Sequence, residues 1–433
     1  MALQFQSASS APAVPAPRAL RHREGLRRTP RGARRRDGLY WAGSAVFALA
    51  LAVVTTLPAH RVWGVCAALG YAGAAVLAGR TPYAWGRASA LAAVAGSVLL
   101  PLAVLTVLGT AQSEVGVVEH SGDLLLATGS PYAPHPSLVD DFNPYLPGMA
   151  LLGLPHALLG DIPLTDARLW FAAVFLGALA VAARPGGGRV RGGWRHGVLS
   201  AARTAVPADP VNPALLLASC PAVALALAVG GVDLPVIGLM CLGLALAGRS
   251  GGAVGAGAAM GAAAALKWTA WPLLPVVLVL LAVTAGRRAA VRAAVTALAV
   301  AAAGVVPFAL VDPHAFVEHV VLFPLGAAGA GSPATSPLPG HLLAAHVPGG
   351  RAIAVAALAA TAVGMAIWLL ARPPRTVVAA ADRVALGLAL AMCLMPATRF
   401  GYLVYPLVLA AWFRRDRFLP SHGRFSVAHE PQL

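Results

Sequence analysis

Two cations stand beside apolar runs of the chain. Lys267, the only lysine, lies in AALKWTAWP, and Arg399 lies in MPATRFGYLVYP. An ammonium attracts phosphate as a point charge, and a planar guanidinium can bind it through two parallel hydrogen bonds. The two residues therefore indicate a site for a lipid phosphate at a membrane boundary. For Lys267 the alternative is a helix-end lysine that extends its ammonium to the interface.

Acidic residues follow the third apolar run, in SEVGVVEHSGDLLLATGSPY. The apolar positions there are spaced as in an amphipathic helix that ends near Gly129 and lies along the membrane surface. Glu114, with Glu119 as the fallback, would stand close to the interface, where a carboxylate can act as a general base toward a hydroxyl. A solvated outer loop is the alternative for each acid, and Asp140 and Asp141 are expected to be solvated.

Other polar residues are open to two interpretations. Asp233, in GGVDLPVIG, either caps a helix with Pro235 just inside it or contacts a sugar hydroxyl. The chain has neither GxxxxGK[ST] nor a DxD motif, which disfavours a cytosolic nucleotide donor. Four histidines share one loop at spacings that match no compact zinc site, so we expect them to be solvated and the protein to bind no metal. They are His314, His319, His341 and His346.

The elements that must position these residues are membrane helices. Of the 433 residues, 58% are apolar and 11% are charged, against about 25% charged in an ordinary soluble domain. Apolar runs of about 18 residues recur, each long enough to cross a hydrocarbon core of ~30 Å. No strand-period alternation accompanies them. The sequence therefore predicts an all-α, polytopic transmembrane bundle of about 11–13 spans, and it excludes a soluble enzyme.

The distribution of arginine predicts the orientation. The net charge of +16 gathers in the N-terminal tail and short loops, which is typical of a topology signal and not of nucleic-acid binding. We expect a disordered, basic cytoplasmic tail over 1–37, a membrane domain over 38–413 and a cytoplasmic tail over 414–433. Segments 112–142 and 311–350 contain no Lys or Arg and are expected to face outward at the cell membrane.

One stretch breaks the expected alternation of sides. Between 112–142 outside and the basic segment 184–203 inside, an odd number of crossings is required, yet two apolar runs intervene. The first run, 143–160, contains three prolines and three glycines, which are poor residues for an uninterrupted helix. Either this run is re-entrant or interfacial, or the basic segment departs from the charge rule.

Together these features resemble the integral-membrane GT-C glycosyltransferases, in particular glycosyltransferase family 87, the polyprenyl-phosphate-mannose-dependent mannosyltransferases of actinobacteria. The pieces that carry the resemblance are, in chain order, LLLATGSPY, FNPYLPGMALLGLP, GGVDLP, AALKWTAWPLLP and PATRFGYLVYP. In order they cover about residues 105–413. The resemblance implies a GT-C-like fold, a polyprenyl-phosphate-linked sugar as donor, a lipid or glycan as acceptor, and no cofactor. Membrane lipids are the other expected partners, and nucleic acid is not one.

The resemblance also implies roles for individual residues. Transfer would be inverting and metal-independent, with Glu114 as the base where the family has Asp, and Glu119 as the fallback. Lys267 and Arg399 would hold the donor phosphate. Contacts to the donor sugar or the acceptor would come from Tyr132, Tyr145, Asp233 and Tyr402. This chain departs from the family by two extra apolar segments ahead of the acidic loop.

Two other functions stay open. A transporter or lipid flippase would also be polytopic, but it would more often show inverted repeats and ionisable residues at mid-membrane. A catalytically inactive relative that serves as a scaffold is the third interpretation, because Glu replaces the family's Asp.

Overall fold

The computed structural model describes residues 31–80, 85–184, 213–328 and 333–414. Helices make up 78% of these residues, and none of them belongs to a strand. The prediction of an all-α, polytopic membrane protein is therefore confirmed. The predicted tails 1–37 and 414–433 and the basic segment 184–203 lie almost wholly outside the described residues.

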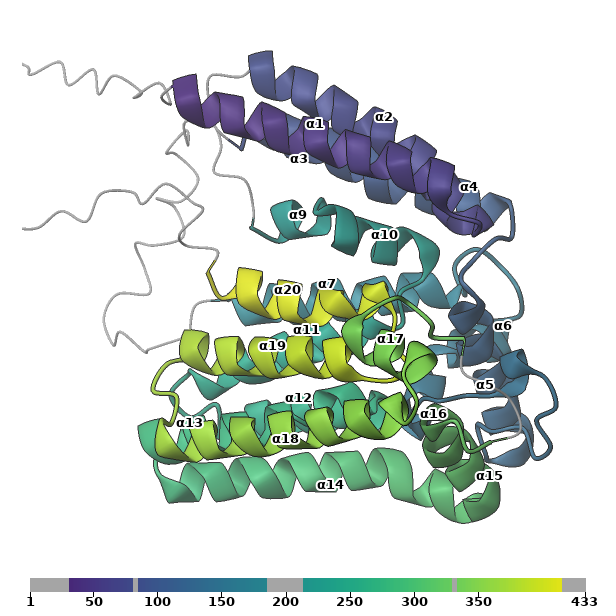
Figure 1. The fold of residues 1–433 in the computed structure, drawn as a ribbon, viewed down its shortest axis with the longest axis vertical. Helices are drawn as coiled ribbons and strands as arrows, with labels where there is room; N and C mark the ends of the chain where they lie inside the picture. The colour runs from purple at the N-terminus through teal and green to yellow at the C-terminus, as the bar shows by residue number, and fades with distance from the viewer. Residues whose placement is uncertain (1–30, 81–84, 185–212, 329–332, 415–433) are drawn as a thin grey trace, which may run out of the picture.

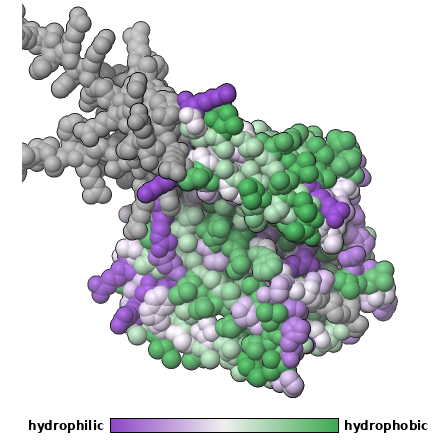
Figure 2. Space-filling view, turned by 45° about the horizontal axis from the view of Figure 1, so that its top comes forward, coloured by the Kyte–Doolittle hydropathy of each residue, from purple (hydrophilic) through white to green (hydrophobic). Residues whose placement is uncertain are grey.

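Long apolar helices run side by side through the bundle (Figure 1). Within the described ranges, six are long and apolar enough to cross a membrane: α1 (Arg31–Val54), α2 (Pro58–Arg80), the continuous helix of α3 (Arg87–Val94), η1 (Ala95–Leu99) and α4 (Leu100–Val107), α14 (Arg287–Val311), α18 (Gly350–Ala371) and α19 (Val377–Leu394). Shorter apolar helices lie among them: α7 (Ala167–Ala183), α9 (Pro213–Ala218), α10 (Pro221–Val229), α11 (Asp233–Ala247), α12 (Ala253–Leu266), α13 (Leu273–Thr284) and α20 (Val404–Trp412). Apolar side chains cover much of the outer surface (Figure 2), as contact with lipid requires.

The short elements collect at one end of the bundle, called here the loop end (Figure 1). They are α5 (Ser113–Thr128), η2 (Val139–Asp141), η3 (Pro147–Leu152), α6 (Leu154–Leu159), α15 (Pro313–Val317), η5 (Glu318–Leu322), α16 (Phe323–Leu325) and α17 (Pro339–His346). The two segments without Lys or Arg thus lie at the same end. Helix α14 leads into this end from Arg287 and Arg288, which places those cations roughly 37 Å away. That the loop end faces outward stays a prediction.

Residues 143–160 do not cross the bundle. They form η3 and α6, two elements of six residues each, joined at Gly153. Glycine lets this segment lie against its neighbours, because a Cβ at Gly148 would be 2.8 Å from the carbonyl oxygen of Ala265, and one at Gly153 would be 2.1 Å from that of Val118. The segment therefore packs against α5 and α12 at the loop end, as the re-entrant or interfacial interpretation predicts. The single helix α7 then leads to the opposite end.

The first helices form a layer of their own along one side of the bundle (Figure 1). Within the layer, the indole of Trp63 donates to the carbonyl of Ser97 at 2.8 Å. The hydroxyl of Tyr71 donates to the carbonyl of Ser219 at 2.8 Å, which joins the layer to the short helices α9 and α10. This layer contains the two additional apolar segments, and the predicted site residues all lie outside it.

Candidate active site

Lys267 ends α12, and its ammonium lies in a buried cluster. The Nζ atom is 2.5 Å from Oδ1 of Asp233, and the two side chains are 12% and 14% exposed. The rings of Tyr145 and Tyr402 face the ammonium, with centroids 5.2 and 5.1 Å from Nζ. Ring faces attract cations, and this attraction grows when water is excluded. The ammonium therefore points into the protein, and it does not extend to solvent as the alternative interpretation of Lys267 required.

The backbone places this pair at the loop end. Lys267 adopts an extended conformation where α12 stops, and Asp233 is the first residue of α11. The N-cap position of α11 is Val232, without a side-chain capping bond, so Asp233 pairs with the lysine and does not cap the helix. The positive end of the α11 dipole favours its carboxylate. Tyr405 donates its hydroxyl to Oδ1 of Asp233 at 2.9 Å and accepts a hydrogen bond from Thr269 at 2.7 Å.

A second ion pair lies at the same end of the bundle. Arg399 begins the 3-10 turn η6 (Phe400–Leu403), and its guanidinium contacts the carboxylate of Glu114 in the first turn of α5. Their side chains are 30% and 15% exposed. Tyr402, three residues after Arg399, is one of the rings facing Lys267. The predicted base and one predicted phosphate ligand are therefore partners, and η6 connects them to the lysine cluster.

Tyr132 reaches the site only indirectly. Its ring is 1% exposed, and its hydroxyl donates to the carbonyl of Tyr145 at 2.9 Å. Helix α5, predicted to end near Gly129, does end there, with Gly129 in the left-handed conformation at φ 77°. The loop that follows brings Tyr132 behind Tyr145. Tyr132 thus supports the tyrosine that faces the ammonium.

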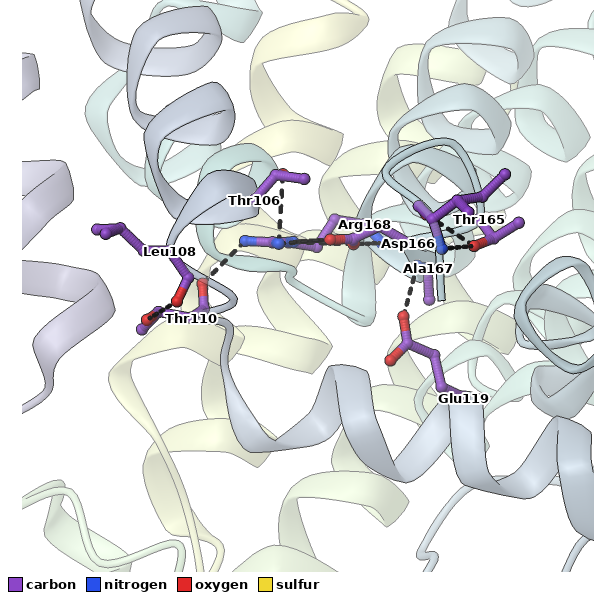
Figure 3. A network of polar contacts seen from close by, with 9 residues as sticks. Thr106, Leu108, Thr110, Glu119, Thr165, Asp166, Ala167 and Arg168 are labelled. Carbon is purple, nitrogen blue, oxygen red and sulfur yellow. Dashed lines mark hydrogen bonds and ion pairs between the residues drawn. The ribbon is translucent and has the colours of Figure 1, made fainter. Parts of the chain in front are cut away.

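Glu119 lies in a different network (Figure 3). Its Oε1 accepts from the backbone N–H of Ala167 at 2.9 Å, at the start of α7. Burial raises the pKa of this carboxyl, and the hydrogen bond from Ala167 opposes the rise. The next residue, Arg168, is 3% exposed and pairs with the carboxylate of Asp166. The fallback base therefore contacts the start of a helix, where its negative charge is favourable.

Sequence reasoning missed several residues that the fold brings to the site. Tyr405 stands in the quoted PATRFGYLVYP motif, and its spacing of three from Tyr402 on a helical turn was the signal that could have found it. Asn143 stands in the quoted FNPYLPG stretch. His319 was expected to be solvated, which is wrong, because its side chain is fully buried. Its nitrogens contact Asn143 and Ala133, residues far away in sequence.

The arrangement combines two cations, two carboxylates and aromatic rings at one end of a membrane bundle. Such a set can bind an anionic group and accept a proton from a hydroxyl. In the part of the chain that the structure describes, no three His, Cys, Asp or Glu side chains come together as metal ligands would.

Comparison with known proteins relates the site to one family. The model of glycosyltransferase family 87 matches residues 143–396, more than half of the chain. The match contains Tyr145, Asp233 and Lys267, whereas Arg399 lies three residues after its end and Glu114 lies 29 residues before its start. No curated protein and no solved structure matches the chain.

Proposed function

The chain belongs to glycosyltransferase family 87 and is a membrane glycosyltransferase, and we propose that it takes its sugar, mannose, from a polyprenyl-phosphate donor. The acceptor is a hydroxyl of a lipid or glycan. The observation that carries the proposal is the convergence of Lys267 and Arg399, which are 132 residues apart in sequence, on the two tyrosines and two carboxylates of the loop end. Two cations at one membrane boundary suit a phosphate that carries negative charge in the donor and more of it after transfer.

Each cation is paired with a carboxylate in the free protein. Of the three protons that the Lys267 ammonium can donate, the described contacts use one, toward Asp233. A phosphate can therefore join Lys267 without displacing Asp233. At Arg399 the phosphate takes the place of Glu114, because both are anions that bind the same guanidinium edge. Donor binding thereby frees the Glu114 carboxylate beside the sugar.

The transfer step then has a role for each group. The acceptor oxygen attacks the anomeric carbon from the face opposite the phosphate, and its proton passes to Glu114. The bond between the anomeric carbon and the phosphate oxygen breaks, and the polyprenyl phosphate leaves with its charge held by Lys267 and Arg399. Tyr145 and Tyr402 pack against the sugar, and Asp233 accepts from a sugar hydroxyl.

An apolar cavity supports a lipid-linked donor. It has a volume of about 240 Å³ and lies between α13, α18 and α19. Its lining includes Pro272, Val276, Leu358, Leu369 and Leu388. Pro272 follows Lys267 by five residues, so one lining residue is close in sequence to the proposed phosphate ligand. A prenyl chain can enter such a cavity from the surrounding lipid while its phosphate stays at the loop end.

The test of the proposal is transfer of label. Membranes containing the protein, incubated with radiolabelled polyprenyl-phosphate-mannose, should move mannose into a lipid or glycan fraction. The Glu114→Gln variant in the same membranes is the matched control and should transfer far less. Movement of the donor across the membrane without transfer of label would favour a flippase, and no label transfer from any polyprenyl-phosphate sugar would refute the proposal.

The outward orientation has its own test. Single cysteines placed at Ser137 and Ser336, in a chain with its four native cysteines replaced, should react with a membrane-impermeant maleimide in intact cells. A cysteine at Arg288, at the opposite end of α14, should react only after the cells are permeabilised. Protection of both loop cysteines would invert the topology and place the donor site on the cytoplasmic side.

A further inference from the structure

His319 is the one described histidine that is fully buried, and both of its ring nitrogens have partners. Nδ1 accepts from the backbone N–H of Asn143 at 2.9 Å, and Nε2 lies 2.9 Å from the carbonyl oxygen of Ala133. A carbonyl only accepts, so Nε2 carries the proton and Nδ1 does not. The neutral imidazole thus joins the turn η5 to the loop ahead of η3.

Asn143 links His319 to Tyr145 through hydrogen bonds. Its Oδ1 accepts from the backbone N–H of Tyr145 at 3.0 Å, while the hydroxyl of Tyr132 donates to the carbonyl of the same residue. The next residue, Leu146, donates its N–H to the carbonyl of Leu266 at 3.1 Å, directly before Lys267. Both peptide groups of Tyr145 are therefore held, and the segment is tied to the end of the helix that carries the lysine.

We propose that His319 is a positioning residue for sugar transfer, which through Asn143 holds the ring of Tyr145 against the ammonium of Lys267. The proposal rests on the function proposed above, because it concerns the same phosphate and sugar site. His319 touches neither donor nor acceptor. Its part is to join the segment 311–350 to the segment that carries Tyr145, so that the aromatic wall of the site has one position.

The geometry predicts how low pH affects the hydrogen bond between Asn143 and His319. A proton on Nδ1 would face the N–H of Asn143, and the hydrogen bond would be lost. The carboxyl groups near the ring, Asp141, Asp312 and Glu318, favour the protonated ring, but burial opposes it more strongly and lowers the pKa of His319 below its usual value. The contact is therefore retained at about pH 6.5, the ordinary pKa of histidine, and is lost only as the pH falls through the lowered pKa of His319.

The test uses two substitutions of different chemistry. His319→Phe keeps a ring among Tyr132 and Phe142 but removes both nitrogens. His319→Asn places an amide oxygen where Nδ1 lies, so it restores the acceptor for Asn143 without a titrating group. His346→Phe, at an exposed histidine of the same segment, is the matched control. The readouts are donor KM, kcat, their pH profiles and the amount of folded protein.

A positioning role predicts a specific pattern. At matched folded protein, His319→Phe should lose roughly 10- to 100-fold in kcat/KM, as expected for a misplaced binding group. His319→Asn should recover most of the loss and should lack the acid limb of the wild-type pH profile, and His346→Phe should behave as wild type. Unchanged kinetics in His319→Phe, or no recovery in His319→Asn, would overturn the proposal, since the ring would then serve packing alone.

Failure of the proposed function can be distinguished from failure of the positioning role of His319. If the wild-type protein transfers no sugar, the phosphate site can still be tested by the binding of a polyprenyl phosphate that carries no sugar. This binding is measured by the quenching of tryptophan fluorescence. Weaker binding by His319→Phe than by His319→Asn would support the positioning role. Equal binding by the two variants and the wild-type protein would contradict it.

Discussion

Two buried ion pairs lie at the loop end, and they differ in how many hydrogen bonds their cations have left to make. Arg168 donates through Nε to both oxygens of Asp166, at 2.9 and 3.0 Å, and through Nη1 to the carbonyl of Thr110 at 3.0 Å. Its Nη2 donates to Asp166 and to the hydroxyl of Thr106 (Figure 3). Lys267, in contrast, uses one donor on Asp233 and turns its other sides to two aromatic rings.

The difference separates a structural pair from a binding pair. Removing one partner of a buried ion pair is strongly destabilising, because the other charge is left without compensation. Arg168 is committed to the junction between α4, the loop that follows α4, and α7, and the described contacts use four of its five N–H donors. Lys267 retains donors and a ring-lined environment, which is what an incoming anion requires. Burial of a cation alone would not have distinguished the two.

The largest expected effect concerns the base. Glu114→Gln removes the ionisable group at nearly constant size, so turnover should fall on the order of 10²–10⁴-fold. The donor KM should stay the same or decrease, because Arg399 loses a competing carboxylate. Glu114→Asp should keep partial activity. Measurement of kcat and KM with a labelled donor checks this, with Glu119→Gln as the comparison.

Glu119→Gln sharpens that result. Its amide oxygen can still accept from the N–H of Ala167, and we expect turnover to be retained. Loss of turnover in Glu119→Gln with full turnover in Glu114→Gln would move the base five residues along α5. Full turnover in both variants would contradict a base in this helix and favour the scaffold or transporter interpretation.

The next effect tests the structural pair. Arg168→Met leaves the carboxylate of Asp166 buried without its partner, and breaking a buried pair in this way costs about 3–5 kcal/mol. The unfolding transition in detergent should shift accordingly, while the fraction that remains folded should keep its donor KM. The double variant Arg168→Met/Asp166→Asn should recover part of the stability. A changed donor KM with unchanged stability would reverse the assignment of the two pairs.

The two proposed phosphate ligands, Lys267 and Arg399, should give a smaller effect that falls on donor binding, measured at matched folded protein because Lys267→Ala also leaves Asp233 without its cation. Lys267→Ala and Arg399→Ala each remove a charge-assisted hydrogen bond worth about 1.5–3 kcal/mol, or roughly 10- to 150-fold in donor affinity. Lys267→Arg should rescue only in part, because a planar fork fits the site differently. Arg61→Ala, at an exposed arginine of α2, is the control. Wild-type donor KM in both alanine variants at matched expression would place the phosphate elsewhere.

The smallest effect follows from the raised pKa of Glu119. A carboxyl whose pKa is higher in the folded state favours folding at low pH, and this contribution is lost as the pH rises through the folded-state pKa. Glu119→Gln should therefore be slightly more stable than wild type at pH 7–8, by at most about 1 kcal/mol because the carboxylate is partly exposed to solvent. The difference should vanish near pH 4. Thermal unfolding at both pH values measures it, and lower stability of the variant at pH 8 would show that the hydrogen bond to Ala167 outweighs burial.

The membrane class and the helices were determined by the sequence itself. Apolar composition and run length decide whether a segment can cross lipid, and both are local properties of the chain. The same holds for helix α5 and its end at Gly129, because apolar spacing and a glycine that accepts positive φ are visible within twenty residues. Charge predicted an odd number of crossings between 112–142 and 184–203, and this stays a prediction. The prolines and glycines of 143–160 left open whether that run crosses, and the structure shows two short elements there.

The partners of the polar residues were decided only by the tertiary structure. Residue types predicted that Lys267 and Arg399 would bind anions, but they did not predict that Asp233 and Glu114 would be those anions. The members of these pairs lie 34 and 285 residues apart, and helix packing brings them together. His319 carries no local sign of burial, because its contacts with Asn143 and Ala133 depend on how two loops meet. A side chain's type sets which bonds it can make, whereas the packing of distant segments decides which of them form.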